Sequence, residues 1–371
     1  MINDIGLTVA RAIPYEHLAG LLGGSLTVHG GVIRDAGGRI VSHLVLPGAS
    51  AALNAIPGAG LLGSLVNGIQ LRALSTDVAA VKAATEQVLN YSMATAALSG
   101  LGLATSLTGF VYMATRLKRI DQKLGAVEKQ TKAIRKFLDS AQHAQLSNAV
   151  DSLKLAQGAS DPETRRHLLV QCKQSFGTLA HQYRSLLEDP EEVAELSATE
   201  DCYVLAAIGS VTTTSDLGMF DDARDEMKRY QAEWQSIARR HCGKLVLKDE
   251  PARLLDPRYL KAVPTHQLIR LLDFTNNTNK GVGWMDDLRE TLGTTTFVRS
   301  ALSSTDPAHI AYASKLLAKD ETLDGFVAHM AFLAEQKVSL SHFAREAEEL
   351  QKRSGGEFLV LTPRSMAGAA A

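Results

Sequence analysis

Three glycines, Gly58, Gly60 and Gly63, have the G-x-G-x-x-G spacing that can cradle the pyrophosphate of a dinucleotide. That fingerprint needs an apolar strand before it, a helix opening from it, and an acidic residue at the end of a second strand. Here Pro57 directly precedes the first glycine, and the pattern after Gly63 is that of a continuous helix through Asp77. We interpret the glycines as sites of close helix packing or as breaks in an apolar segment, and we expect no cofactor.

Histidine and cysteine side chains form no catalytic or metal-binding pattern. His241 and Cys242 are adjacent, but neighbouring side chains on a helix point in different directions, whereas a nucleophile and its base must face each other. The three cysteines are too few and too scattered for a disulfide framework or a CxxC metal site. We therefore expect neither an enzyme nor a metal site. The alternative is an active site assembled from distant residues of the C-terminal half.

Charge is distributed unevenly along the 371 residues. The chain carries 39 basic and 40 acidic side chains, so the balance predicts no nucleic-acid partner. Two long stretches, 40–71 and 87–115, hold no Asp, Glu, Lys or Arg, whereas 116–139 has a net charge of +5. The start of the chain has no basic region before its apolar residues, which argues against a secretory signal, so we expect the protein to face the cytoplasm.

The uncharged stretch 87–115 is the strongest functional signal. As one helix its 29 residues would span about 43 Å, more than the roughly 30 Å of bilayer hydrocarbon. Interspersed Ser, Thr and Gly keep it only moderately hydrophobic, so a buried helix of a soluble domain is the alternative. We expect these side chains to contact lipid: Leu98, Leu101, Leu103, Leu107, Phe110, Val111 and Met113.

A basic helix with heptad spacing follows directly. Positive residues beside an apolar segment favour the cytoplasmic side and attract anionic headgroups, a role we assign to Arg116, Lys118, Arg119 and Lys123. Apolar residues at alternating spacings of three and four predict a coiled-coil seam, or else an amphipathic helix that packs on its own domain. The seam, completed by Thr131, comprises Leu117, Ile120, Leu124, Val127, Ile134 and Leu138.

The rest of the chain predicts a mainly α fold with a small N-terminal β-hairpin. Alternating residues around Asp35–Gly38 favour a hairpin or meander over about 25–46, and Pro14 breaks a short helix over 1–20. Asp-Pro pairs mark helix starts in the C-terminal half. We expect helices at about 161–187, 190–216, 219–241, 257–274, 306–319, 321–337 and 339–353. The predicted regions are an N-terminal one at 1–47, an apolar membrane-interacting one at 48–150, a helical domain at 151–360 and a flexible tail at 361–371.

Two resemblances accompany these patterns. The stretch 215–227, with Gly218, Phe220 and Ala223, resembles the turn and second helix of a single tetratricopeptide repeat. The order of heptad helix (69–88), apolar element (87–115) and second heptad helix (116–139) resembles α-helical pore-forming toxins of the cytolysin A and haemolysin BL type. That resemblance covers roughly 70 residues. It implies an apolar element that stays sheltered until it inserts and a homo-oligomer as the pore.

These features predict a membrane-acting helical effector or toxin-like protein. Its partners would be a lipid membrane, further copies of itself and a protein bound by the C-terminal domain, which stays in the cytoplasm. The alternative is a soluble or membrane-anchored helical interaction scaffold without catalytic activity.

Overall fold

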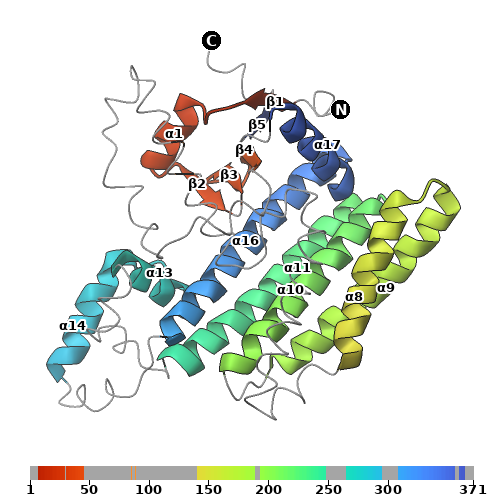
Figure 1. Ribbon diagram of the computed structural model, residues 1–371. Helices are drawn as coiled ribbons and strands as arrows, with labels where there is room; N and C mark the ends of the chain where they lie inside the picture. Colours follow the sequence, from red (N-terminus) through yellow and green to blue (C-terminus); the bar gives the residue numbers. More distant parts are fainter. Residues whose placement is uncertain are drawn as a thin grey trace.

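The computed structural model describes residues 7–29, 31–45, 85, 88, 140–188, 193–247, 265–294, 308–355 and 359–363. Within these residues the protein is mainly α-helical, with one small antiparallel sheet. Most of the helices form a bundle, and the sheet lies against one side of it (Figure 1).

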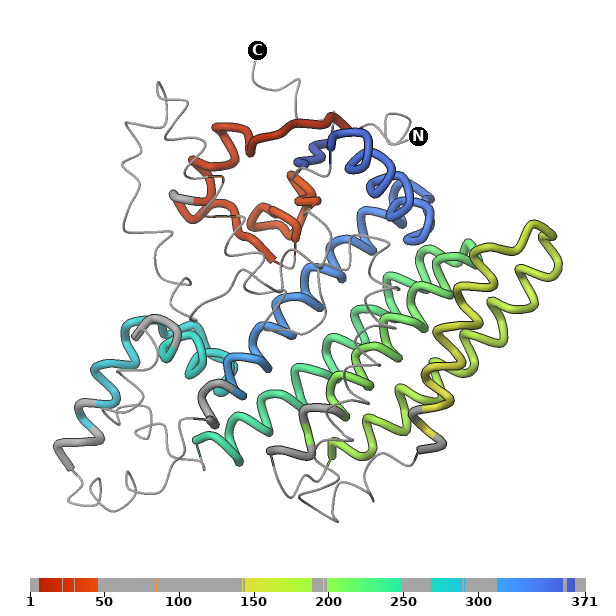
Figure 2. The backbone as a smooth tube through the Cα atoms, in the orientation of Figure 1, coloured from red at the N-terminus to blue at the C-terminus, as the bar shows by residue number. Residues whose placement is uncertain are grey.

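Four long helices form the body of the bundle. They are α8 (Ser140–Gly158), α9 (Pro162–Leu186), α10 (Val193–Asp216) and α11 (Phe220–His241). Figure 2 traces them side by side, from the yellow α8 to the green α11. The start of α9 shows why the sequence folds this way, because Asp161 accepts a hydrogen bond from the backbone N–H of Thr164 at 2.8 Å and Pro162 occupies the first turn.

Helix packing follows the apolar stripes. On α9 the buried residues recur every three or four positions and face α8 and α10: Leu169, Cys172, Phe176, Leu179, Ala180 and Tyr183.

Gly218 turns the chain between α10 and α11 with a φ of +80°, a conformation that favours glycine. The stretch 215–227 is thus the junction of a helix hairpin.

The C-terminal helices complete the bundle and lead to the sheet. Helix α16 (Ala308–Gln336) packs along α11, and α17 (Leu340–Arg353) contacts the C-terminal part of α10. A π-helical turn (Cys242–Leu247) extends α11. At the far end of the bundle lie α13 (Thr265–Asn276), a 3-10 turn (Gly281–Gly283) and α14 (Trp284–Thr294).

The sheet joins the two ends of the chain. Its strands are β1 (Leu7–Ala10), β2 (Leu26–His29), β3 (Val32–Asp35), β4 (Ile40–Val45) and β5 (Leu359–Pro363), in the order β1-β5-β4-β3-β2. All neighbours are antiparallel, with Leu7 opposite Pro363 and His43 opposite both Val32 and Leu361.

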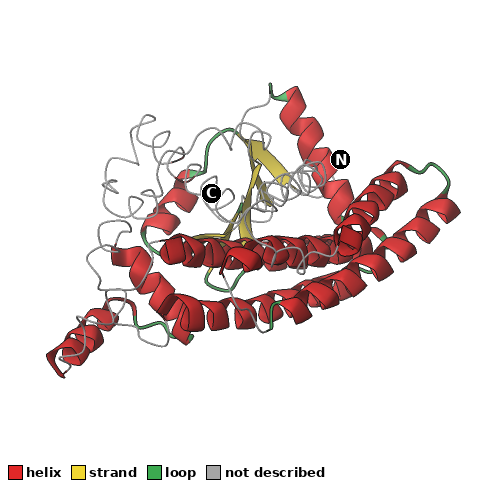
Figure 3. Ribbon diagram, turned by 60° about the horizontal axis from the view of Figure 1, so that its bottom comes forward, coloured by secondary structure: helices red, strands yellow, loops and turns green. Residues whose placement is uncertain are grey.

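Each face of the sheet is covered. Figure 3 shows the strands above the layer of long helices. Val32 and Ile40 pack against Ala328 and Phe332 of α16, while Leu7, Val45, Leu359 and Leu361 extend into the main core. On the opposite face, α1 (Tyr15–Leu22) places Leu18 with Ile33, Val41, Leu44 and Val360 in a separate apolar cluster that also includes Ile13.

The predicted fold class is confirmed, and three details of the prediction are corrected. Leu7–Ala10 form a strand, so the helix of the N-terminal region begins only after Pro14. The helices predicted at 306–319 and 321–337 are one helix, and Lys319, at the expected break, is buried and paired with Asp201. Residues 359–363 form a strand, so the boundary expected at residue 360 falls inside β5, and 361–363 are not part of a flexible tail.

Candidate functional site

The predicted membrane-contacting, headgroup-contacting and seam residues, from Leu98 to Leu138, lie outside the described residues. Their roles therefore remain predictions. Two residues near the start of the uncharged stretch are described. Thr85 and Val88 are helical and buried, within the region 69–88 where a heptad helix was predicted, and Val88 joins the apolar cluster between α1 and the sheet. The start of the uncharged stretch is thus in contact with folded protein.

The β2–β4 meander, residues 26–45, is held on α16 by a polar contact centred on Asp324. The carboxylate of Asp324 accepts hydrogen bonds from Arg34 of β3 and from Gln231 of α11, the latter at 3.2 Å, and lies 3.0 Å from Nδ1 of His29 on β2. Burial alone would raise the pKa of Asp324, but the hydrogen bond from His29 and the charges of His29 and Arg34 outweigh it and lower the pKa. The carboxylate is therefore charged at neutral pH.

A pair of buried histidines lies next to this contact. His43 of β4 and His329 of α16 have ring centroids 5.1 Å apart, and neither side chain has more than 1% of its surface exposed. Phe332 and Phe343 pack edge-on or tilted against the imidazoles. None of the four ring nitrogens has a hydrogen-bond partner among the described residues. We name these two residues the histidine pair.

Burial sets the protonation state of the histidine pair. It lowers the pKa of His329 to about 3, and burial together with the neighbouring His329 holds the pKa of His43 well below its usual value. Both rings are therefore neutral in this fold at physiological pH.

A cluster of charges is buried at the centre of the bundle. Nζ of Lys319 on α16 lies 2.7 Å from Oδ1 of Asp201 and 3.2 Å from Oε2 of Glu200, both on α10. Lys319 and Glu200 have no side-chain exposure, and Lys315 lies 3.5 Å from Asp201 near the edge of the cluster. Tyr312 donates a hydrogen bond to Glu200 and lies 3.2 Å from Nδ1 of His241.

The members of this cluster stabilise one another's charges. Burial opposes the charge on Lys319, but Asp201 and Glu200 outweigh it and raise the pKa of the ammonium group. Burial likewise opposes the charge on Glu200, yet Lys319 and the hydrogen bonds from His241 and Tyr312 lower its pKa. The cluster is therefore an ionised network inside the core, where removing one partner is costly.

His241 and Cys242 do not form a nucleophile and base. Nε2 of His241 lies 3.0 Å from the carbonyl oxygen of Leu187, and Nδ1 lies 3.2 Å from the hydroxyl of Tyr312 and 3.5 Å from Glu200, so both ring nitrogens are engaged away from Cys242. Cys242 is fully buried, and burial raises the pKa of its thiol to about 12. A thiol with a raised pKa is a poor nucleophile at neutral pH.

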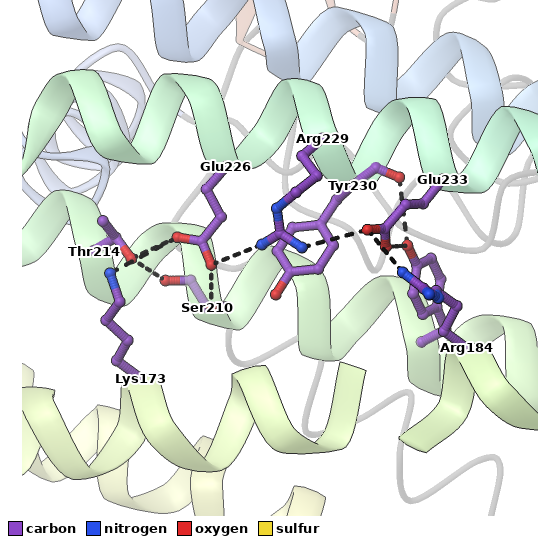
Figure 4. A network of polar contacts seen from close by, with 9 residues as sticks. Lys173, Arg184, Ser210, Thr214, Glu226, Arg229, Tyr230 and Glu233 are labelled. Carbon is purple, nitrogen blue, oxygen red and sulfur yellow. Dashed lines mark hydrogen bonds and ion pairs between the residues drawn. The ribbon is translucent and has the colours of Figure 1, made fainter. Parts of the chain in front are cut away.

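A second polar network ties α9, α10 and α11 together near the surface (Figure 4). Glu226 of α11 accepts hydrogen bonds of 2.7 Å from Ser210 and Thr214 of α10. Glu233, two turns further along α11, lies 3.0 Å from Arg184 of α9 and accepts a hydrogen bond of 3.1 Å from Tyr203 of α10. This arrangement fixes the register of the three helices.

Sequence reasoning missed both the buried charge cluster and the histidine pair. A local signal existed for the cluster, since Glu200 and Asp201 immediately precede the apolar run CYVLAAIGSV of the same helix. His43 likewise lies in an apolar strand, but no local pattern connects it with His329, which is 286 positions away.

Two negative findings apply to the described residues only. No group of three or more His, Cys, Asp or Glu side chains among them could hold a metal ion. None of the described helices combines the length and hydropathy that a bilayer crossing requires.

Comparison of the chain with protein-family models, curated proteins and solved structures gives no significant match. Its function must therefore be argued from its own residues.

Proposed function

We propose that the protein acts at a lipid bilayer through residues 87–115, as a helical effector or toxin-like protein. The observation that carries the proposal is a stretch of 29 uncharged residues followed at once by a segment with a net charge of +5. Apolar side chains enter hydrocarbon, and each basic residue near an anionic surface contributes about 1 kcal/mol of attraction. The C-terminal domain would stay on the cytoplasmic side with the basic residues.

The described neighbours of this stretch support the proposal. In the sequence it lies between β4, which ends at Val45, and α8, which begins at Ser140. Val88, at the start of the stretch, packs on the sheet in this state. A membrane-active segment tethered at both ends, with its entrance held on protein, is suited to insertion on a trigger.

A single substitution tests bilayer contact. Leu103→Asp places a charge in the predicted lipid-facing segment, which costs about 2.5 to 3.5 kcal/mol near the centre of a membrane-spanning helix. We expect wild type to float with vesicles containing phosphatidylserine and the variant to remain in the dense fractions. Leu155→Asp is the matched control, because Leu155 is 67% exposed on α8 and should tolerate the charge. Equal flotation of the Leu103 variant and wild type would refute the proposal.

The finer form of the proposal is a pore made by several copies joined along the seam 117–138. Release of an encapsulated dye from the same vesicles tests it. We expect wild type to cause leakage and Leu124→Asp to bind vesicles without leakage, because a charge in the seam opposes oligomerisation. Leakage by the variant at the wild-type rate would exclude this seam.

The alternative function is an interaction scaffold, which the described bundle of helix hairpins favours. A soluble scaffold would be monodisperse without detergent and would not bind vesicles of any composition. Flotation of wild type therefore separates a soluble scaffold from the membrane-acting protein, whereas a membrane-anchored scaffold would float without releasing the dye.

A further inference from the structure

The histidine pair is an unusual component for an interface between a sheet and a helix. Leaving a buried polar group without a hydrogen bond costs about 1 to 3 kcal/mol, and a phenylalanine at either position would avoid that cost among the same aromatic neighbours. His43 and His329 thus weaken the resting interface, and protonating either ring would place an unpaired charge inside it.

The groups around the pair offer no compensation for such a charge. Asp324 of α16 is the nearby carboxylate, and it is already engaged by Arg34 of β3 and His29 of β2. Phe343 of α17 contacts both imidazoles, Phe332 contacts His43, and the strand neighbours of His43, Val32 and Leu361, are apolar. Protonation of one imidazole would therefore place a charge among aromatic rings. Protonation of the second would place a like charge beside the first.

The meander also contacts Val88, the residue of the apolar stretch that the structure describes. Strand β4 ends at Val45, where the chain enters residues 46–139, and the opposite face of β3 and β4 contributes Ile33, Val41 and Leu44 to the cluster that contains Val88. Displacing the meander from α16 therefore displaces the surface on which the entrance of the stretch is packed.

We propose that the histidine pair is an acid-sensitive latch, and that protonation of His43 and His329 releases the β2–β4 meander from α16, and with it the surface on which Val88, at the start of the apolar stretch, is packed. This inference rests on the proposed function and adds its trigger. Asp324 remains charged at mildly acidic pH because its pKa is lowered, so the acid sensitivity comes from the imidazoles, and release must also break the contact of Asp324 with Arg34.

The size of the effect follows from linkage. An imidazole that is neutral in the docked state and titrates at its ordinary pKa of 6.5 in the released state shifts the equilibrium toward release by about 30-fold at pH 5. Both imidazoles together give up to about a thousand-fold. His29, which lies 3.0 Å from Asp324, is partly exposed at the edge of the meander and does not belong to the buried pair.

Hydrogen exchange of the full-length protein at pH 7.5 and pH 5, expressed as protection factors, tests the latch. We expect amides of 26–45 to lose protection by 30-fold or more at pH 5, while those of α8 and α9 keep theirs. The variants His43→Phe and His329→Phe should each reduce the loss, and the double variant should abolish it. His181→Phe is the control, because His181 is an exposed histidine of α9.

Either single variant suffices if the other fails to fold, since each imidazole contributes its own shift. Equal acid sensitivity of the folded variants and wild type would overturn the latch, as would simultaneous loss of protection in α8 and α9. Vesicle flotation at both pH values separates the latch from the proposed function. Acid-induced exchange without flotation at either pH would support the latch and refute the membrane function, whereas flotation with unchanged exchange would do the reverse.

Discussion

The ammonium group of Lys319 lies 2.7 Å from Oδ1 of Asp201, at the contact between α16 and α10, and the lysine side chain has no solvent exposure. With Glu200 at 3.2 Å, this lysine compensates two carboxylates on one helix turn. Its two partners on α10 lie more than a hundred positions earlier in the sequence. The ion pairs select one register of α16 on the bundle, because a shift by one residue would leave all three charges buried without partners.

Lys319→Met should therefore destabilise the protein strongly. The substitution preserves an unbranched side chain but leaves Glu200 and Asp201 without their main counter-charge, which typically costs about 3 to 5 kcal/mol. Urea denaturation at pH 7.5 measures the loss as a decrease in the free energy of unfolding. Lys154→Met is the control, since the Lys154–Asp151 pair on α8 is exposed and contributes under about 1 kcal/mol. A similar small effect at both positions would show that water compensates the buried carboxylates.

The sequence predicted the helices better than it predicted their partners. Helix α9 begins where the Asp161-Pro162 pair indicated and ends within one residue of the expected position, because capping and apolar spacing are local properties. Strand β5 escaped prediction because its partners β1 and β4 lie more than 300 positions earlier in the chain. The local sequence of a five-residue strand does not indicate which distant strand it pairs with.

Prediction of the candidate site from the sequence was limited in the same way. Charge and hydropathy patterns indicated a membrane-acting stretch, and Thr85 and Val88 are buried and helical within the region where a heptad helix was predicted. No local pattern indicated the histidine pair. The local signal of the buried ion pairs, Glu200 and Asp201 directly before an apolar run, was missed because a charged residue in a sequence is normally read as exposed. Lys319 and Glu200 depart from that rule because each supplies the partner that the other needs.

Asp324→Asn should loosen the meander on α16 at neutral pH. The amide keeps the shape of the carboxylate but loses its charge-assisted bonds with Arg34 and His29, which contribute about 1.5 to 3 kcal/mol. We expect exchange of the β2 and β3 amides to accelerate about tenfold or more at pH 7.5. Asp151→Asn, at an exposed pair on α8, should leave these amides unchanged. Uniform acceleration across the bundle would instead assign Asp324 a role in global stability.

Asp320→Asn should stabilise the protein at alkaline pH. Burial raises the pKa of Asp320 from 3.8 to about 7, and Gln235 donates only a long hydrogen bond of 3.4 Å to it. The folded protein thus keeps this proton where the unfolded chain has lost it, so stability falls as the pH rises from about 4 to about 7. An asparagine is neutral throughout, so the gain in the free energy of unfolding should be largest at pH 8 and vanish near pH 4.

Asp222→Asn, at an exposed position of α11, is the control for that pH profile and should give no gain at any pH. A gain at Asp320 that is independent of pH would show that packing, and not burial of the charge, explains it.

Gly209→Ala and Gly177→Ala should change stability in opposite directions. A Cβ atom at Gly209 on α10 would lie 2.6 Å from Cδ1 and Cε1 of the buried Phe176 ring on α9, so the two helices could not keep their separation. We expect a loss of about 1 to 3 kcal/mol. At Gly177, on α9, no atom lies within 4 Å of the added Cβ, and the helix propensity of alanine should stabilise by up to about 1 kcal/mol. The substitution is the same at both positions and both are helical. Helix propensity alone therefore predicts the same sign of the stability change at both. Stabilisation at both sites, measured by thermal and urea unfolding, would mean that Phe176 can move aside and that the close approach of α9 and α10 does not depend on glycine.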